Sequence, residues 1–207
     1  MTLTDIDICS NALVRIGDSP ISSFIESDAA RSCAAIYPFV KLDILTSYPW
    51  RVNMRKSDLL SRDQTGPTTE YKYSYQLPTD MIGTIRKAFN SKNTPAGPQP
   101  HFQGYEIYGR KLYSNAEQVL VDYQIDVNEQ TMPYYMIELL ILATAAEIVL
   151  PDTDRQTLAE FFTIKAWGLP SENKRGGQFK KATLMDSQGQ RPPRTTNFPL
   201  TAARQGG

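Results

Sequence analysis

The sequence of 207 residues predicts a mainly helical α+β fold. It consists of a four-helix bundle-like body, an inserted small antiparallel β region and an extended C-terminal arm. Apolar residues recur at helical spacing in 1–50 and again in 131–187, and these two stretches are expected to form the body. In the β region, 51–130, the period changes to two, which is typical of half-buried strands. The arm, 188–207, is rich in Pro, Arg, Thr and Gly and shows no periodicity.

Two helices are predicted in the first fifty residues. Thr4 is a suitable N-cap for the first helix, and Gly17 is free to adopt the left-handed conformation that ends it. The second helix is expected from Asp28 to Tyr48. Pro38 lies inside it and costs about 3 kcal/mol in a continuous helix, so we expect a kink or a break there.

The β region is predicted to be one small antiparallel sheet of about four or five strands. A pair of them is expected to be joined by a turn at Gly109-Arg110. The Pro-rich stretch 90–101 is expected to be a loop. The predicted strands are Tyr71–Tyr75, Ile82–Phe89, Tyr105–Tyr108, Lys111–Tyr113 and Val119–Ile125.

Helical periodicity returns after Pro133, which suits a first helical position. The stretch Met136–Leu150 is apolar nearly all round, which predicts a central, buried helix. A fourth helix is expected to end near Trp167, before Gly168-Leu169-Pro170, and Gln178–Ser187 can form another short helix. The residues predicted to form the inner face of the fourth helix are Leu158, Phe161, Phe162 and Ala166.

The charge is distributed unevenly along the chain. Lys and Arg number 22, as do Asp and Glu, so the net charge is zero, which argues against a general nucleic-acid coat. From Pro170 to Gly207, however, there are seven basic and two acidic residues, a net charge of +5. The rest of the chain therefore carries −5. A basic arm on an acidic body indicates either a binding partner for the arm or a solvated tail.

Other features of the composition point to a soluble protein made in a reducing cytosol. Cys9 and Cys33 are too few for a disulfide framework. The first residues lack the basic region of a signal peptide, and the longest apolar stretch is too short and too polar to span a membrane.

The sequence offers no convincing catalytic, metal or cofactor site. The single histidine, His101, lies in the Pro-rich loop. Asp152 and Asp154 form the only tight acidic pair, and helix capping accounts for them better than a metal or a hydrolase site does. Gly176-Gly177 lacks the strand and helix that frame a phosphate loop. We therefore predict a protein that is not an enzyme and has no cofactor.

Tyrosines are concentrated in the β region. Tyr71, Tyr73 and Tyr75 alternate with polar residues, and Tyr105 and Tyr108 follow in a later strand. Aromatic side chains on a sheet can stack on nucleic-acid bases, but no arginine stripe accompanies these. A sheet core or a protein interface is the preferred interpretation.

Several short segments occur in an order that resembles a known family. The sequence is similar to the tail tubular protein A family, the head-to-tail adaptors of short-tailed bacteriophages, in segments that cover most of the chain. They are Ala12–Gly17, Pro20–Ser23, Ala30-Arg31, Tyr37-Pro38, Asp43–Leu45, Pro49-Trp50, Tyr75–Asp80, Tyr105–Tyr113, Asp186–Pro192 and Arg204. The sequence departs from the family at Arg51-Val52-Asn53, and at Gly168–Pro170 and Gly176-Gly177, which interrupt an expected long final helix.

The resemblance implies a structural component of the virion. Twelve subunits would form a ring between the portal protein and the tail nozzle protein, and DNA would pass through its lumen without sequence-specific binding. The tyrosines of the β region would form the interface on the tail side. The residues expected to contact the portal or a neighbouring subunit are Lys180, Lys181, Arg191, Arg194, Phe198, Leu200 and Arg204. The alternative is a nucleic-acid-binding module that acts through the basic arm.

Overall fold

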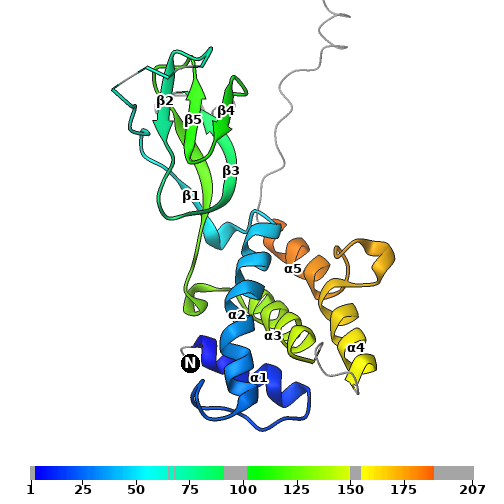
Figure 1. The fold of residues 1–207 in the computed structure, drawn as a ribbon. Coiled ribbons are helices and arrows are strands. Elements are labelled where there is room, and N and C mark those ends of the chain that lie inside the picture. The colour runs from blue at the N-terminus through cyan, green and yellow to red at the C-terminus, as the bar shows by residue number, and fades with distance from the viewer. Residues whose placement is uncertain (1–2, 65, 68, 91–101, 150–154, 189–207) are drawn as a thin grey trace, which may run out of the picture.

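The helical body and the β region lie at opposite ends of the molecule in the computed structural model (Figure 1). The structure describes residues 3–64, 66–67, 69–90, 102–149 and 155–188. The fold is α+β, as the sequence predicts. The more specific expectation of a four-helix bundle is not confirmed, because the described residues form five α-helices.

Local sequence signals set the ends of the first two helices. Helix α1 (Asp5–Arg15) begins with a capping box, in which the backbone N–H of Thr4 donates to Asp7 Oδ2 over 2.8 Å. Gly17 follows α1 with a φ of 88°, as predicted for its end. Helix α2 (Asp28–Ser47) runs without interruption, so the expected break at Pro38 is not found. The proline faces solvent, where water can bond the carbonyl that its missing N–H leaves free.

Helix α3 is the centre of the body. It contacts each of the other four helices, and eleven of its residues are buried. The prediction of a central, buried helix after Pro133 is therefore confirmed. The bounds of the remaining helices are Tyr134–Val149 for α3, Gln156–Trp167 for α4 and Gly177–Ser187 for α5. Among the described residues, no helix combines the length and apolar character needed to cross a membrane.

One prediction about α4 is wrong. Phe161 was assigned to the inner face, but its side chain is 48% exposed, whereas the neighbouring Phe162 is buried. Successive residues on a helix point about 100° apart, and because Phe162 takes the core position, Phe161 is turned towards solvent.

The β region contains two small antiparallel sheets instead of the single sheet predicted. One has the strand order β1-β6-β3 and the other β2-β5-β4. Their facing side chains, including Tyr75 and Leu112 from one sheet and Val121 from the other, share a separate hydrophobic core. The strands are β1 (Met54–Lys56), β2 (Tyr73–Gln76), β3 (Met81–Phe89), β4 (Tyr105–Tyr108), β5 (Lys111–Ser114) and β6 (Leu120–Ile125).

A buried polar cluster joins the β region to the helical body. Gln124 of β6 is fully buried, and its Nε2 donates to the carbonyl oxygens of Leu45 at 2.6 Å and Tyr48 at 2.7 Å. Its Oε1 accepts a hydrogen bond from Arg86 Nε at 2.7 Å, and Arg86 also donates to Thr46 O at 2.6 Å. The C-terminal end of α2 is thereby bonded to both β3 and β6.

The chain before β2 is fastened to its sheet by Asp63. The carboxylate accepts hydrogen bonds from Lys111 Nζ at 2.8 Å, Ser74 Oγ at 2.9 Å and Gln76 Nε2 at 3.1 Å. The bond from Lys111, followed by those from Ser74 and Gln76, lowers the pKa of Asp63 from 3.8 to about 2.

This lowered pKa predicts a pH dependence. Because the folded-state pKa lies below the unfolded one, the stabilisation is present above about pH 4 and is lost as the pH falls through about 2. A carboxyl-carbon NMR titration is expected to give a midpoint near 2 for Asp63, and Asp63→Asn should remove its share of the acid sensitivity. A midpoint near 3.8 would contradict the prediction.

Candidate assembly surfaces

Helix α5 is held against the body by its inner face. The ring of Phe179 lies 5.8 Å from that of Trp50 and 5.6 Å from that of Trp167. The buried carboxylate of Asp186 accepts a hydrogen bond from the Tyr135 hydroxyl at 2.8 Å and from the backbone N–H of Arg51 at 3.3 Å. These contacts fix the rotation of α5 about its axis and therefore determine which residues face outward.

The outer face of α5 combines positive charge with exposed apolar side chains. Lys180 and Lys181, both predicted contact residues, are exposed, and so are Leu184 and Met185 one turn later. This apolar pair is not among the predicted contact residues, although its spacing of four from the two lysines is a signal in the sequence. The other predicted contacts, Arg191, Arg194, Phe198, Leu200 and Arg204, lie outside the described residues.

The loop between α4 and α5 is tightly folded and presents two cations. The backbone N–H of Gly176 donates to Trp167 O at 2.8 Å, and that of Leu169 donates to the Glu172 carboxylate at 2.9 Å. Asn173 and Lys174 both have positive φ angles, 50° and 59°, which are uncommon for residues with side chains. The loop explains why the chain departs from one long final helix.

This loop forms one wall of a cleft of about 500 Å³ against the C-terminal end of α2. Aromatic side chains of Tyr48, Trp167 and Phe179 line it, and Lys174 Nζ lies 5.7 Å from the centre of the Trp167 ring. Lys174 and Arg175 stand at one edge, and Asp43 lines the cleft from α2. An apolar side chain flanked by an anionic group would suit such a lining.

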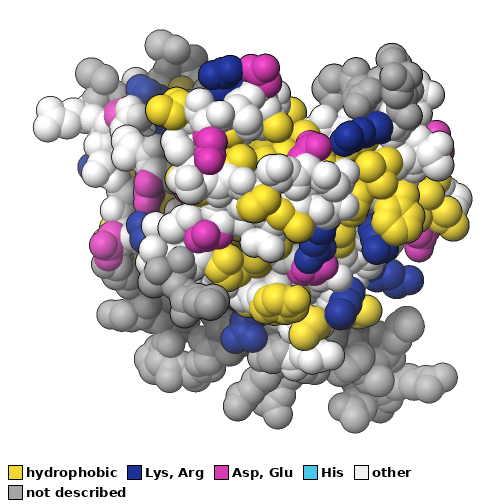
Figure 2. All heavy atoms as spheres, turned by 90° about the horizontal axis from the view of Figure 1, so that it is seen from below, with side chains coloured by type: hydrophobic (Ala, Val, Ile, Leu, Met, Phe, Trp, Pro, Cys, Tyr) yellow, Lys and Arg dark blue, Asp and Glu magenta, His cyan; other side chains and the backbone are white. Residues whose placement is uncertain are grey.

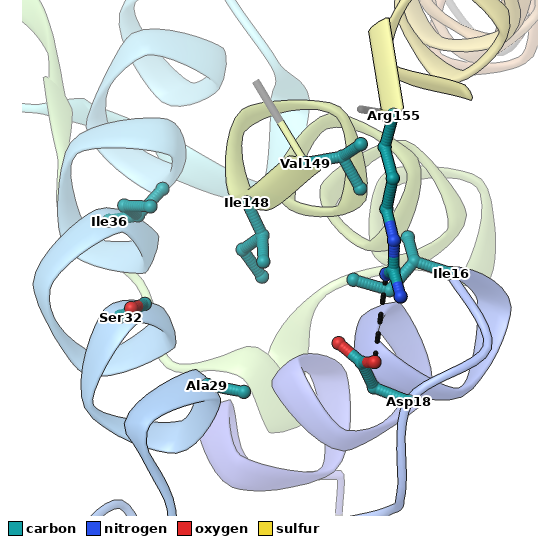
Figure 3. A pocket seen from close by; sticks show the side chains of 8 residues that line it. All are labelled: Ile16, Asp18, Ala29, Ser32, Ile36, Ile148, Val149 and Arg155. Carbon is teal, nitrogen blue, oxygen red and sulfur yellow. Dashed lines mark ion pairs between the residues drawn. The ribbon is translucent and has the colours of Figure 1, made fainter. Parts of the chain in front are cut away.

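A second cleft, of about 320 Å³, lies where α1, α2, α3 and α4 approach one another (Figure 3). Figure 3 shows the apolar side chains of Ile16, Ile148 and Val149 around the hollow. At one side Arg155 and Asp18 form an ion pair of 3.6 Å. The cleft is mainly apolar and offers no arrangement of nucleophile and base.

The predicted interface tyrosines of the β region do not form one exposed surface. Tyr75 is only 1% exposed and its ring packs in the core between the sheets. Tyr75 is therefore a core residue and not an interface residue as predicted, because the second sheet covers the face on which it lies. Tyr71, Tyr73 and Tyr105 are half-buried, and Tyr108 is exposed, with its hydroxyl donating to Glu106. Of the five, Tyr108 is therefore the most accessible to a partner.

Of the cysteine, histidine and aspartate residues considered for chemistry, the structure describes the two cysteines. Cys9 and Cys33 are buried between α1 and α2, and their mutual hydrogen bond and burial raise the pKa of the Cys9 thiol. His101, Asp152 and Asp154 lie outside the described residues. Within the part of the chain that the structure describes, no cluster of three or more His, Cys, Asp and Glu side chains is arranged to hold a metal ion.

Comparison of the chain with models of protein families and with curated proteins finds no match.

Proposed function

We propose that this chain is a structural virion protein, the head-to-tail adaptor of a short-tailed bacteriophage. In this proposal it is made in the host cytoplasm and assembles as the twelve-subunit ring that the resemblance implies, between the portal protein and the nozzle protein. DNA passes through its lumen without sequence-specific binding, and the chain catalyses no reaction. The observation that carries the proposal is the outer face of α5, which leads directly into the basic arm.

The proposed contact works by adhesion. Lys180 and Lys181 pair with acidic groups on the portal or on a neighbouring subunit, and Leu184 and Met185 pack into apolar depressions. The basic arm that follows α5 in the sequence extends this contact beyond the helix. The β region, at the other end of the molecule in Figure 1, is left available for the nozzle, with Tyr108 as its exposed aromatic residue.

The test is docking to the purified portal, observed by electron microscopy and measured as an affinity. Removal of 188–207 should abolish docking while leaving the helical circular dichroism unchanged. The double substitution Lys180→Glu/Lys181→Glu should weaken docking by about tenfold or more, because reversed charges at an interface repel their former partners.

The matched control is Lys72→Glu/Lys87→Glu, which makes the same charge change on exposed residues of the β region. It should leave portal affinity within about twofold of the wild type, since well-separated exposed charges are screened. Unchanged docking of the truncated chain would refute the role of the arm.

A second candidate is supported by the concentration of cations around α5. Lys174, Arg175, Lys180 and Lys181 are all exposed and directly precede the basic arm. A nucleic-acid-binding module of this kind predicts a steep salt dependence, with about 0.9 added to the slope for each neutralised phosphate. Binding to a DNA duplex should then fall sharply between about 50 mM and 200 mM salt. A flat response would remove this candidate and leave the adaptor.

A further inference from the structure

Helix α2 carries an apolar stripe on the side opposite its core face. Cys33, Tyr37 and Ile44 point into the body and are buried. Phe39 is 75% exposed and Leu42 is 46% exposed, and an exposed Ala35 completes the spacing i, i+4, i+7. An exposed helix of a monomer is usually polar on this side, so the α2 stripe (Ala35, Phe39, Leu42) indicates a contact that the single chain does not make.

Helix α4 carries a stripe of the same spacing. Phe161 is 48% exposed and Ile164 is 42% exposed, and Thr157 is the exposed residue one turn before them. The buried residues Ala159, Phe162 and Ala166 occupy the other side of the helix. Seen from below, hydrophobic side chains gather with Lys and Arg on the side of the molecule where α4 lies (Figure 2). The α4 stripe (Thr157, Phe161, Ile164) is thus largely exposed in the described part of the chain, with the Phe161 ring contacting the Phe162 ring at 5.4 Å between centroids.

The two stripes lie on opposite sides of the body. Both α2 and α4 pack on α3, and Figure 1 shows α3 between them. We propose that the α2 stripe of one copy packs against the α4 stripe of the next copy, in a head-to-tail contact that repeats around a ring. Because the contact joins two different surfaces, an open row of copies keeps one free α2 stripe at one end and one free α4 stripe at the other, and closing the row into a ring pairs them. This inference rests on the proposed function, which requires such a ring, and adds the surfaces that build it.

Charge favours pairing of unlike stripes. Asp43 follows Phe39 by four residues, and Lys165 follows Phe161 by four residues, with its Nζ 4.4 Å from the centre of that ring. Pairing α2 with α4 brings the carboxylate and the ammonium group into one interface. In the same register, pairing α2 with α2 would place two Asp43 side chains together, and pairing α4 with α4 would place two Lys165 side chains together, which is unfavourable. The occupant of each stripe is therefore the other stripe of a second copy.

The test uses Phe39→Asp and Phe161→Asp, measured by sedimentation on the chain alone and by electron microscopy on the chain with portal. Both side chains are largely exposed, so the substitutions should leave the fold intact, as circular dichroism will show. Each variant alone should fail to form rings, with subunit association weakened at least tenfold. An equimolar mixture of the two should form one-to-one heterodimers and nothing larger, because each pair retains a single intact contact.

A charge exchange provides an independent test. Asp43→Lys and Lys165→Asp should each weaken association, and the two together in one chain should restore it. Leu59→Asp, at an exposed apolar residue near the β region, is the control and should assemble normally. Rings that survive Phe39→Asp or Phe161→Asp, or self-association of either variant, would overturn this inference alone. A wild-type chain that stays monomeric both alone and with portal would overturn the proposed function as well.

Discussion

Replacement of Gln124 by Leu is expected to destabilise the protein by about 3–5 kcal/mol, one of the two largest effects foreseen for a single side chain. The substitution has nearly the same volume, so its cost comes from polar groups. The carbonyl oxygens of Leu45 and Tyr48 lose their amide donor, and Asn53 loses a hydrogen bond of 3.1 Å. A buried acceptor without a partner costs about 1–3 kcal/mol.

Arg86 increases the penalty. Its guanidinium is half-buried and bonds Gln124 Oε1 and Thr46 O. In Gln124→Leu, the Arg86 guanidinium would keep Thr46 O as a hydrogen-bond acceptor but would lose Gln124 Oε1. Gln124→Glu retains an acceptor for Arg86 but removes the amide donor, so it should fall between the wild type and Gln124→Leu.

Urea unfolding is the appropriate measurement, followed by circular dichroism and by the fluorescence of the buried Trp50, which lies beside the junction. The control is Gln118→Leu, at an exposed position just before the same strand, which should shift stability by less than about 0.5 kcal/mol. A loss of less than about 1 kcal/mol of unfolding free energy for Gln124→Leu would mean that water replaces the amide as hydrogen-bond donor, and that the junction does not exclude water.

Gln124 also illustrates which parts of the fold the sequence could not predict. Alternation in 119–125 correctly placed Val119, Val121 and Tyr123 in the core. The same pattern implies a solvent-facing position for Gln124, yet the end of α2 covers it. No pattern within β6 indicates that α2 supplies the hydrogen-bond acceptors of Gln124, because Leu45 lies 79 residues earlier in the sequence.

Predictions that rest on local chemistry succeeded at two helix ends: Thr4 caps α1 and Gly17 adopts a positive φ, because both outcomes depend on neighbouring backbone groups. Pro133 lies one residue before α3 instead of at its first position, and the break expected at Pro38 is not found. Strand β1 was missed for the opposite reason. Its three residues, Met54–Lys56, carry no periodicity and become a strand only through pairing with β6.

Some residues of the candidate surfaces could be predicted from the sequence, and others could not. Composition identified Lys180 and Lys181, and the structure places both on an exposed helix face. It did not identify Phe161, which is predicted on the inner face of the fourth helix together with Leu158, Phe162 and Ala166. Only the position of α4 on α3 reveals that Phe162 takes the core position and leaves Phe161 outside. The contact roles of the two lysines remain predictions that the portal assay tests.

The second large effect is expected at Gly168, where Ala should cost about 3 kcal/mol or more. Gly168 has φ 85° and ψ −171°, a region of backbone conformation that essentially only glycine adopts. An added Cβ would lie 2.5 Å from the Gly176 Cα and 2.9 Å from its carbonyl carbon. These are backbone atoms, held by the bond from Gly176 N–H to Trp167 O, and they cannot move aside without opening the loop.

Gly17→Ala is the matched control for this prediction. Its φ of 88° is nearly the same, but nothing lies within 4 Å of the added Cβ, so only the conformational cost of about 1–2 kcal/mol applies. The difference in unfolding free energy between the two variants therefore measures the steric cost of adding a Cβ where Gly168 approaches Gly176. If Gly168→Ala opens the loop, hydrogen exchange should accelerate in α5, since Phe179 packs on Trp167 at the base of the loop. Portal docking should then weaken although Lys180 and Lys181 are unchanged, because α5 no longer holds them in place. Equal losses of unfolding free energy for the two alanine variants would show that the loop accommodates the added Cβ easily. The close contact of Gly168 with Gly176 would then not be what positions α5.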